Sequence, residues 1–129
     1  MKTSVLFFSF TLTLLFSCKK DPGCTDPTAD NFNDLAEVND GSCTYSGQVV
    51  FWMGNPFNFV DVNVNGCTKT ISVYYPSGGV TCGSNGCATF DLPIGTYSYS
   101  AEEEGSFGLE WSGYFIVEKN TCLTLQLTP

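Results

Sequence analysis

The 129-residue chain contains 13 acidic residues and five Lys, with no His and no Arg, so its formal net charge is −8 at pH 7. The absence of His excludes Ser–His and Cys–His catalytic pairs and every zinc site that contains His. The negative charge excludes a protein that binds the phosphate backbone of nucleic acids. Thirteen Gly, six Pro and 15% aromatic residues favour strands and turns over helices.

The first 17 residues have the pattern of an export signal. Met1-Lys2-Thr3 is a short basic start, and an almost unbroken apolar run follows from Val5 to Phe16. This run is too short for a membrane-spanning helix, which needs about 20 apolar residues. We therefore expect residues 1–17 to be removed after export.

The residues at the end of this segment, Leu15-Phe16-Ser17-Cys18, resemble the lipobox of bacterial lipoproteins. The resemblance implies that Cys18 becomes the lipid-modified N-terminus, that residues 18–23 form a tether, and that the membrane is a partner. Two or three acyl chains would make the attachment effectively permanent. The expected location is the outer membrane or cell surface. The alternative is an ordinary secretory signal in which Cys18 stands by coincidence.

The remaining six cysteines point to disulfides. Without Lys2, four Lys oppose 13 acids, a formal net charge of −9, which disfavours binding to nucleic acid and to anionic lipid. Six is an even number of cysteines, and exported chains fold in an oxidising compartment. We expect three bridges, whose pairing the spacing alone does not decide.

Residues 24–45 look like a separate small module. The stretch from Gly23 to Cys43, GCTDPTADNFNDLAEVNDGSC, resembles a short repeat bounded by cysteines in exported proteins of Bacteroidota. In that repeat the two cysteines bracket the unit, which implies a Cys24–Cys43 disulfide. Closing the loop would stabilise it by about 3 kcal/mol in the chain-entropy estimate.

The acids of this module raise calcium as a candidate cofactor, because Ca²⁺ takes six to eight oxygen ligands. The candidate ligands are Asp26, Asp30, Asp34 and Asp40. The EF-hand spacing is absent, and Asp and Asn also cap helices and close turns through their own side chains. Structural capping is therefore the alternative, and no other cofactor is expected.

The remaining residues, 47–129, alternate like strands. Apolar residues recur at every second position in several runs, and Asn65-Gly66 is a strong hairpin signal. The expected strands cover residues 48–53, 59–64, 69–75, 88–92, 95–101, 109–118 and 122–127. Turns recurring at short intervals predict an all-β fold, a small antiparallel β-sandwich of about seven strands, preceded by the disulfide-closed loop module.

The motif Leu92-Pro93-Ile94-Gly95-Thr96-Tyr97, with Trp111-Ser112-Gly113 and Cys122 after it, resembles prealbumin-like and carboxypeptidase-regulatory-like sandwich modules. Such a fold does not itself imply an activity. For the other disulfides we expect Cys82–Cys87 and Cys67–Cys122. A bridge from Cys82 or Cys87 to Cys122 is the alternative.

No catalytic residues are expected. The acidic run Glu102-Glu103-Glu104 is most simply a solvated turn, and a small sandwich leaves little room for the carboxylate-lined cleft of a glycosidase. We expect a structural or interaction protein of the cell envelope, with an envelope protein or a glycan as partner. A glycan would stack on an aromatic platform of Trp52, Tyr74, Tyr75 and Trp111. The alternative for these side chains is core packing.

Overall fold

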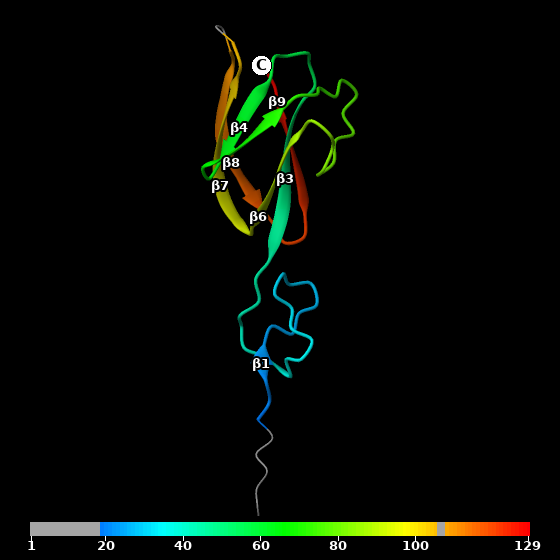
Figure 1. Ribbon diagram of the computed structural model, residues 1–129, viewed down its shortest axis with the longest axis vertical. Helices are drawn as coiled ribbons and strands as arrows, with labels where there is room; N and C mark the ends of the chain where they lie inside the picture. The colour runs from blue at the N-terminus through cyan, green and yellow to red at the C-terminus, as the bar shows by residue number, and fades with distance from the viewer. Residues whose placement is uncertain (1–18, 106–107) are drawn as a thin grey trace, which may run out of the picture.

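The computed structural model describes residues 19–105 and 108–129. These residues form nine strands and no helix, so the all-β prediction is confirmed. Figure 1 shows an elongated molecule in which a small module lies at one end and the C-terminus lies at the other. Within the described ranges no helix is long and apolar enough to cross a membrane. The predicted signal peptide, residues 1–17, and Cys18 lie outside the described residues.

The larger part of the molecule is a sandwich of two sheets. One sheet has the order β6-β3-β9 and the other has the order β5-β4-β7-β8. The strands are β3 (Ser46–Met53), β4 (Val60–Val64), β5 (Cys67–Ile71), β6 (Ala88–Pro93), β7 (Gly95–Glu103), β8 (Glu110–Val117) and β9 (Cys122–Leu127). The expected number of strands is thus found, and β5 ends earlier than predicted.

The core follows from the alternation of apolar residues along each strand. Val60, Val62 and Val64 of β4 are all at most 1% exposed, whereas the residues between them are partly exposed. Phe51 of β3 lies between the sheets and contacts Phe90, Tyr99 and Phe115 with ring centroids 4.8–6.0 Å apart. The hairpin between β4 and β5 turns at Asn65 and Gly66, whose φ angles of 52° and 81° suit the predicted turn.

The sequence predicted an antiparallel sandwich, but one of its strand pairs is parallel. β3 pairs with β6 in antiparallel fashion but with β9 in parallel fashion. Parallel neighbours need a long crossover connection between them, which is usually a helix. Here the chain instead passes through the opposite sheet before it returns as β9, so no helix is required.

The structure contains the predicted Cys24–Cys43 disulfide, but the other two predicted bridges are wrong. Cys82 is bonded to Cys122, one of the two alternative pairings, and among the described residues both Cys67 and Cys87 are free. Cys67 lies at the start of β5, and Lys69 of β5 contacts β6 at one edge of the three-stranded sheet. Cys122 lies at the start of β9, at the opposite edge of the three-stranded sheet. The predicted Cys67–Cys122 bond would therefore have to cross the sandwich.

The Cys82–Cys122 bond holds the segment 72–87 on the outer face of the three-stranded sheet. Cys122 pairs in register with Gln48, and the alternating residues Leu123, Leu125 and Leu127 contribute to the core. The sulfur of Cys122 therefore lies outside, where it also accepts a hydrogen bond from the backbone N–H of Cys82 at 2.9 Å. Cys87 directly precedes β6 and is half-buried, and burial raises the pKa of its thiol.

The small module contains only two short strands, β1 (Pro22–Gly23) and β2 (Val38–Asn39), which pair in parallel. Its large apolar side chains Phe32, Leu35 and Val38 are 42–75% exposed, while Cys24 is 1% exposed. The module therefore has almost no apolar core. Its disulfide and its many side-chain-to-backbone hydrogen bonds, such as those of Asn31 with Ser42 and Thr44, hold it together instead.

One carboxylate fastens the module to the sandwich. Asp26 accepts hydrogen bonds from both the N–H and the hydroxyl of Thr28, from the hydroxyl of Tyr45 and from the ammonium of Lys119, at 2.7–2.9 Å. These bonds, those from Thr28 and Tyr45 first, hold the pKa of Asp26 far below its usual value. The Lys119 ammonium also lies 4.0 Å from the centre of the Tyr45 ring.

The turn between β8 and β9 completes this junction. Asn120 donates its backbone N–H to the carbonyl of Ser46 and its side-chain amide to the carbonyl of Thr28. Gly47 makes the approach possible, because a Cβ atom at this position would lie 2.3 Å from the carbonyl oxygen of Glu118. The module is thus fixed against the β8–β9 turn and does not hang from a free linker.

We expect the Cys82–Cys122 disulfide to stabilise the sandwich. Replacing Cys67, which forms no disulfide, should have little effect on stability. Replacing both Cys82 and Cys122 with Ser should lower the free energy of unfolding by about 4 kcal/mol, because the bond closes a long loop in the unfolded chain. The control Cys67→Ser should leave it within about 0.5 kcal/mol, as expected for an exposed side chain. Denaturant titration without reductant measures both. A large loss in Cys67→Ser would contradict the observed pairing.

We also expect the junction to weaken in acid. Because the folded pKa of Asp26 lies below its unfolded value, its contribution is complete at neutral pH and falls away as the pH drops below about 4. The raised pKa values of Tyr45 and Lys119, each due first to the hydrogen bond with Asp26, make their contributions fade only above about pH 10. Asp26→Asn should lower the melting temperature at pH 7 and flatten its acid dependence. The control Asp34→Asn should do neither.

Candidate functional site

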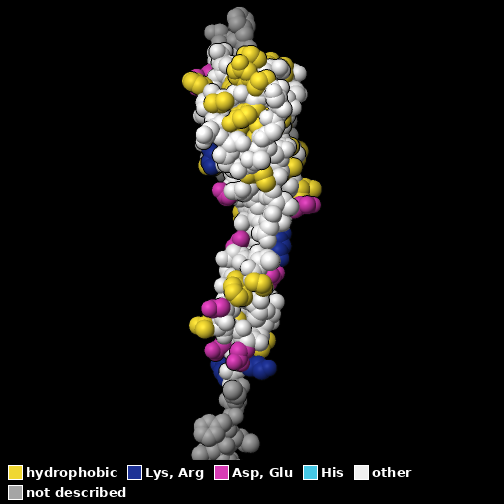
Figure 2. All heavy atoms as spheres, turned by 90° about the vertical axis from the view of Figure 1, so that its right-hand side faces the viewer, with side chains coloured by type: hydrophobic (Ala, Val, Ile, Leu, Met, Phe, Trp, Pro, Cys, Tyr) yellow, Lys and Arg dark blue, Asp and Glu magenta, His cyan; other side chains and the backbone are white. Residues whose placement is uncertain are grey.

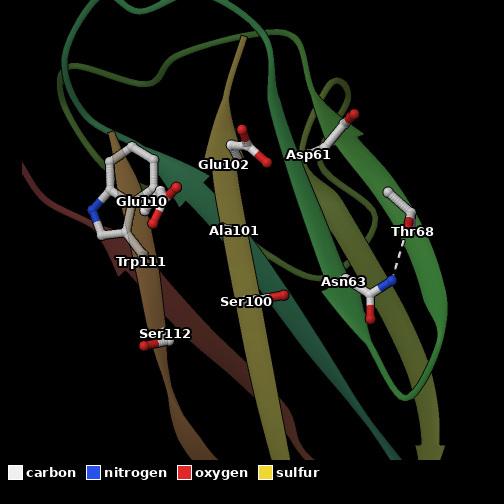
Figure 3. A pocket seen from close by; sticks show the side chains of 9 residues that line it. All are labelled: Asp61, Asn63, Thr68, Ser100, Ala101, Glu102, Glu110, Trp111 and Ser112. Atoms are coloured by element: carbon white, nitrogen blue, oxygen red, sulfur yellow. Dashed lines mark hydrogen bonds between the residues drawn. The ribbon is translucent and has the colours of Figure 1, made fainter. Parts of the chain in front are cut away.

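The outer face of the four-stranded sheet carries the main gathering of functional side chains. Alternation places the apolar residues of β4 inside and their polar neighbours outside, and it also turns Ser100, Glu102, Glu110 and Ser112 of β7 and β8 outward. We call this surface the polar face; it consists of Asp61, Asn63, Ser100, Glu102, Glu110 and Ser112, with Thr68 at its border (Figure 3). These side chains line a shallow, open depression.

Strand register sets the polar face in two rows. Asp61 lies opposite Glu102, and Glu102 lies opposite Glu110, so three carboxylates cross three neighbouring strands in one line. Residues directly opposite each other on antiparallel strands have Cβ atoms about 5 Å apart. The second row contains Asn63, Ser100 and Ser112 in the same way. One row is therefore anionic, and the next one offers hydroxyl and amide groups.

The carboxylate row has few partners of its own. Asp61 accepts a hydrogen bond from the Thr70 hydroxyl, and in the second row the Asn63 amide donates to the Thr68 hydroxyl at 2.9 Å (Figure 3). Lys69 lies between these two threonines on β5 but points to the other face, where it reaches the carbonyl of Thr89 and the ring of Phe90. The only ion pair among the described residues is that of Lys119 with Asp26, at the module junction.

Chemically, this face can attract cations and accept hydrogen bonds. Like charges directly opposite each other lower the stability of a sheet. Water, salt or a ligand must therefore offset the repulsion among these three carboxylates. Its openness makes it unsuited to a reaction that must exclude water. Of the three consecutive acids, only Glu102 belongs to the row. Glu103 instead accepts hydrogen bonds from the backbone N–H groups of Asn58 and Leu109 and joins two loops.

The structure distributes the predicted aromatic platform over different places. Trp52 and Tyr74 come from one region, where Met53 forms a bridge with Tyr74, and Tyr74 is 45% exposed. Tyr75 is half-buried and donates its hydroxyl to the carbonyl of Asn85. Trp111 comes from the other sheet, packs against the core, and donates its indole N–H to the carbonyl of Thr128. None of these four rings stacks on another among the described residues.

The predicted calcium ligands are also engaged separately. Asp26 belongs to the junction, Asp30 accepts a hydrogen bond from the Ser46 hydroxyl, and Asp40 accepts one from the N–H of Ser42. The hydrogen bonds from Ser42 lower the pKa of Asp40. Asp34 is exposed. In residues 19–105 and 108–129, no group of three or more acidic or cysteine side chains is arranged to hold a metal ion. Calcium binding stays a prediction.

Sequence reasoning missed the carboxylate row and the role of Lys119. Asp61, Glu102 and Glu110 are far apart in sequence, and only the register of three strands aligns them. The outward position of each could have been predicted from strand alternation, but not the pairing. The role of Lys119 could not be read from its neighbours in sequence, because its partner Asp26 lies 93 residues away.

Comparison with known proteins assigns no role to these residues. No protein-family model matches the chain, and no curated protein matches it.

Proposed function

We propose that this protein is a lipid-anchored component of the cell envelope, of structural or interaction type and without catalytic activity. In this proposal lipid on Cys18 attaches it to the outer membrane or cell surface, and the chain is one of the exported Bacteroidota lipoproteins that its sequence resembles. The sandwich would be of the prealbumin-like kind. Its partner would be an envelope protein or a glycan, not nucleic acid.

The observation that carries this proposal is the docked module. It would follow directly after the proposed tether, and the Asp26–Lys119 contact joins it to one end of the sandwich. Figures 1 and 2 show the result, an elongated molecule in which the module separates the N-terminal end from the sandwich. Such an arrangement suits a spacer that holds a binding or structural domain away from a membrane. A catalytic role finds no support in a chain without His and with an open, shallow polar face.

The lipid anchor is tested on the full chain produced in a bacterial host that processes lipoproteins. The unchanged chain should sediment with membranes, and mass spectrometry of its N-terminal peptide should show Cys18 carrying a diacylglycerol. The variant Cys18→Ser should appear in the soluble exported fraction, because no acyl chain remains to hold it. Cys67→Ser serves as the control and should stay with the membranes. An unmodified N-terminal peptide from membrane-free protein would refute the anchor.

A glycan-binding role is the second candidate, and the polar face is the observation that favours it. Rows of hydroxyl, amide and carboxylate groups are the hydrogen-bonding partners that sugars use, and of the four predicted aromatic residues Trp111 also lines this depression (Figure 3).

A glycan array probed with the purified full chain tests this role. If the polar face binds a sugar, Glu102→Gln should weaken binding about tenfold, as expected for the loss of a hydrogen bond to a charged group. Tyr74→Ala should leave binding unchanged, as should the exposed control Glu37→Gln. The opposite result would place the sugar on the aromatic residues, and silence across the array would reject the second candidate.

A further inference from the structure

The strand β8 has one edge without a partner. Within its sheet β8 pairs with β7 alone, over eight residues from Gly95–Val117 to Glu102–Glu110. Among residues 19–105 and 108–129, the backbone groups that point away from β7 therefore have no strand to bond. Such an edge is a template for another extended chain, and proteins commonly protect it with Pro, a bulge or inward charges. The sequence of β8, EWSGYFIV, has none of these within it.

Apolar side chains are unusually exposed along this edge. Tyr114 is 82% exposed and Ile116 is 61% exposed, both on the outer face of β8. On the inner side, a groove separates β8 from β9 and includes Phe115, Leu123 and Leu125. We call this the β8/β9 groove. A strand added to β8 would thus cover apolar surface with both of its faces.

The β8/β9 groove has defined ends. The turn of residues 118–121 joins β8 to β9 at one end, and the indole of Trp111 bonds to the carbonyl of Thr128 at the other. Between these two ends, Gly113 places no side chain on the inner face of β8, and the ring of Tyr99 lies against Gly113. The space between these ends corresponds to about seven residues of an extended chain, or roughly 20 Å.

The opposite side of the sandwich is closed by its own contacts. There Lys69 of β5 reaches across to the carbonyl of Thr89 on β6, and the backbone N–H groups of Ser72 and Val73 both donate to the carbonyl of Gly86. The two sheets are therefore joined along β5 and β6. On the closed side Val73 is 43% exposed, whereas Tyr114 and Ile116 on the open β8 edge are 82% and 61% exposed.

The charges along β8 indicate the character of the occupant. On its outer face Tyr114 and Ile116 lie between two exposed acids, Glu110 and Glu118. The nearest cation in sequence, Lys119, is already bound by Asp26. A second copy of this chain would bring the same two acids against this edge, so charge repulsion disfavours self-pairing. A chain with Lys or Arg on both sides of an apolar stretch would complement it.

We propose that the free edge of β8 and the β8/β9 groove bind an extended peptide segment of a partner protein by strand addition, the segment being apolar at alternate positions and basic at both ends. Main-chain hydrogen bonds to β8 would supply the affinity. The groove would select the alternating apolar residues, and Glu110 and Glu118 would select the basic ends. This inference rests on the interaction role proposed above, but it does not depend on the lipid anchor.

A synthetic probe tests the proposal on the purified full chain. The probe is a fluorescent nonapeptide with Lys at both ends, Val at its even positions and Thr between them, so that its two Lys have the same spacing as Glu110 and Glu118. We expect saturable binding by fluorescence anisotropy. We also expect slowed amide hydrogen exchange confined to β8 and its neighbours. A probe N-methylated at alternate residues keeps the side chains but loses the main-chain donors, and it should not bind.

Two variants distinguish selection by side chains from nonspecific binding of the probe. Ile116→Lys should abolish binding of the Lys-ended probe, whereas the control Ile94→Lys, at a residue that is 49% exposed elsewhere on the sandwich, should bind normally. The double variant Glu110→Lys/Glu118→Lys should bind the Lys-ended probe about fivefold or more weakly and should prefer a probe with Glu at both ends. Glu37→Lys/Glu104→Lys is its control and should keep the original preference.

Several outcomes would overturn this proposal. The absence of saturable binding at millimolar probe would do so, as would equal binding of the N-methylated probe or protection of amides outside β8 and its neighbours. Concentration-dependent dimerisation with protection of β8 would instead assign the edge to a second copy of the chain. None of these results bears on the Cys18 test, so a failure here is distinct from a failure of the anchored role.

Discussion

The packing of Phe51 between two sheets is the contact on which the rest of this molecule depends. Its ring lies edge-on or tilted against Phe90 of its own sheet and against Tyr99 and Phe115 of the opposite sheet. Large aromatic side chains each bury a large area and contribute strongly to the stability of a core. Because this cluster fixes the two sheets against each other, it also fixes which faces remain outside, namely the polar face and the edge of β8.

The small module depends on the sandwich in a different way. Burial contributes little to it, since its large apolar residues are exposed and only Cys24 is fully buried. A disulfide limits its unfolded states, and a network centred on Asp26 joins it to Lys119 and Tyr45. Covalent closure and charge-assisted hydrogen bonds thus replace a hydrophobic core, as is common in very small exported units. The same network orients the module relative to the sandwich.

Local patterns in the sequence predicted the parts whose partners lie nearby along the chain. Period-two alternation located β4 and β7, Asn65-Gly66 located the hairpin, and the cysteines that bracket the module formed the bridge implied by its resemblance. Apart from the bounds of β5, the errors involve distant partners. Cys122 bonds Cys82 because strand alternation turns its side chain outward under the loop of residues 72–87, and β9 joins β3 in parallel because the chain crosses to the other sheet first.

The candidate sites show the same division. The sequence by itself determined the all-β class, the excess of acids and the lack of any His, because composition and alternation are local properties of a chain. Only the tertiary structure decided that Asp61, Glu102 and Glu110 form one row, that Lys119 meets Asp26, and that β8 lies at an open edge. Strand register and sheet order bring these residues together, and both are set by contacts between residues far apart in the sequence.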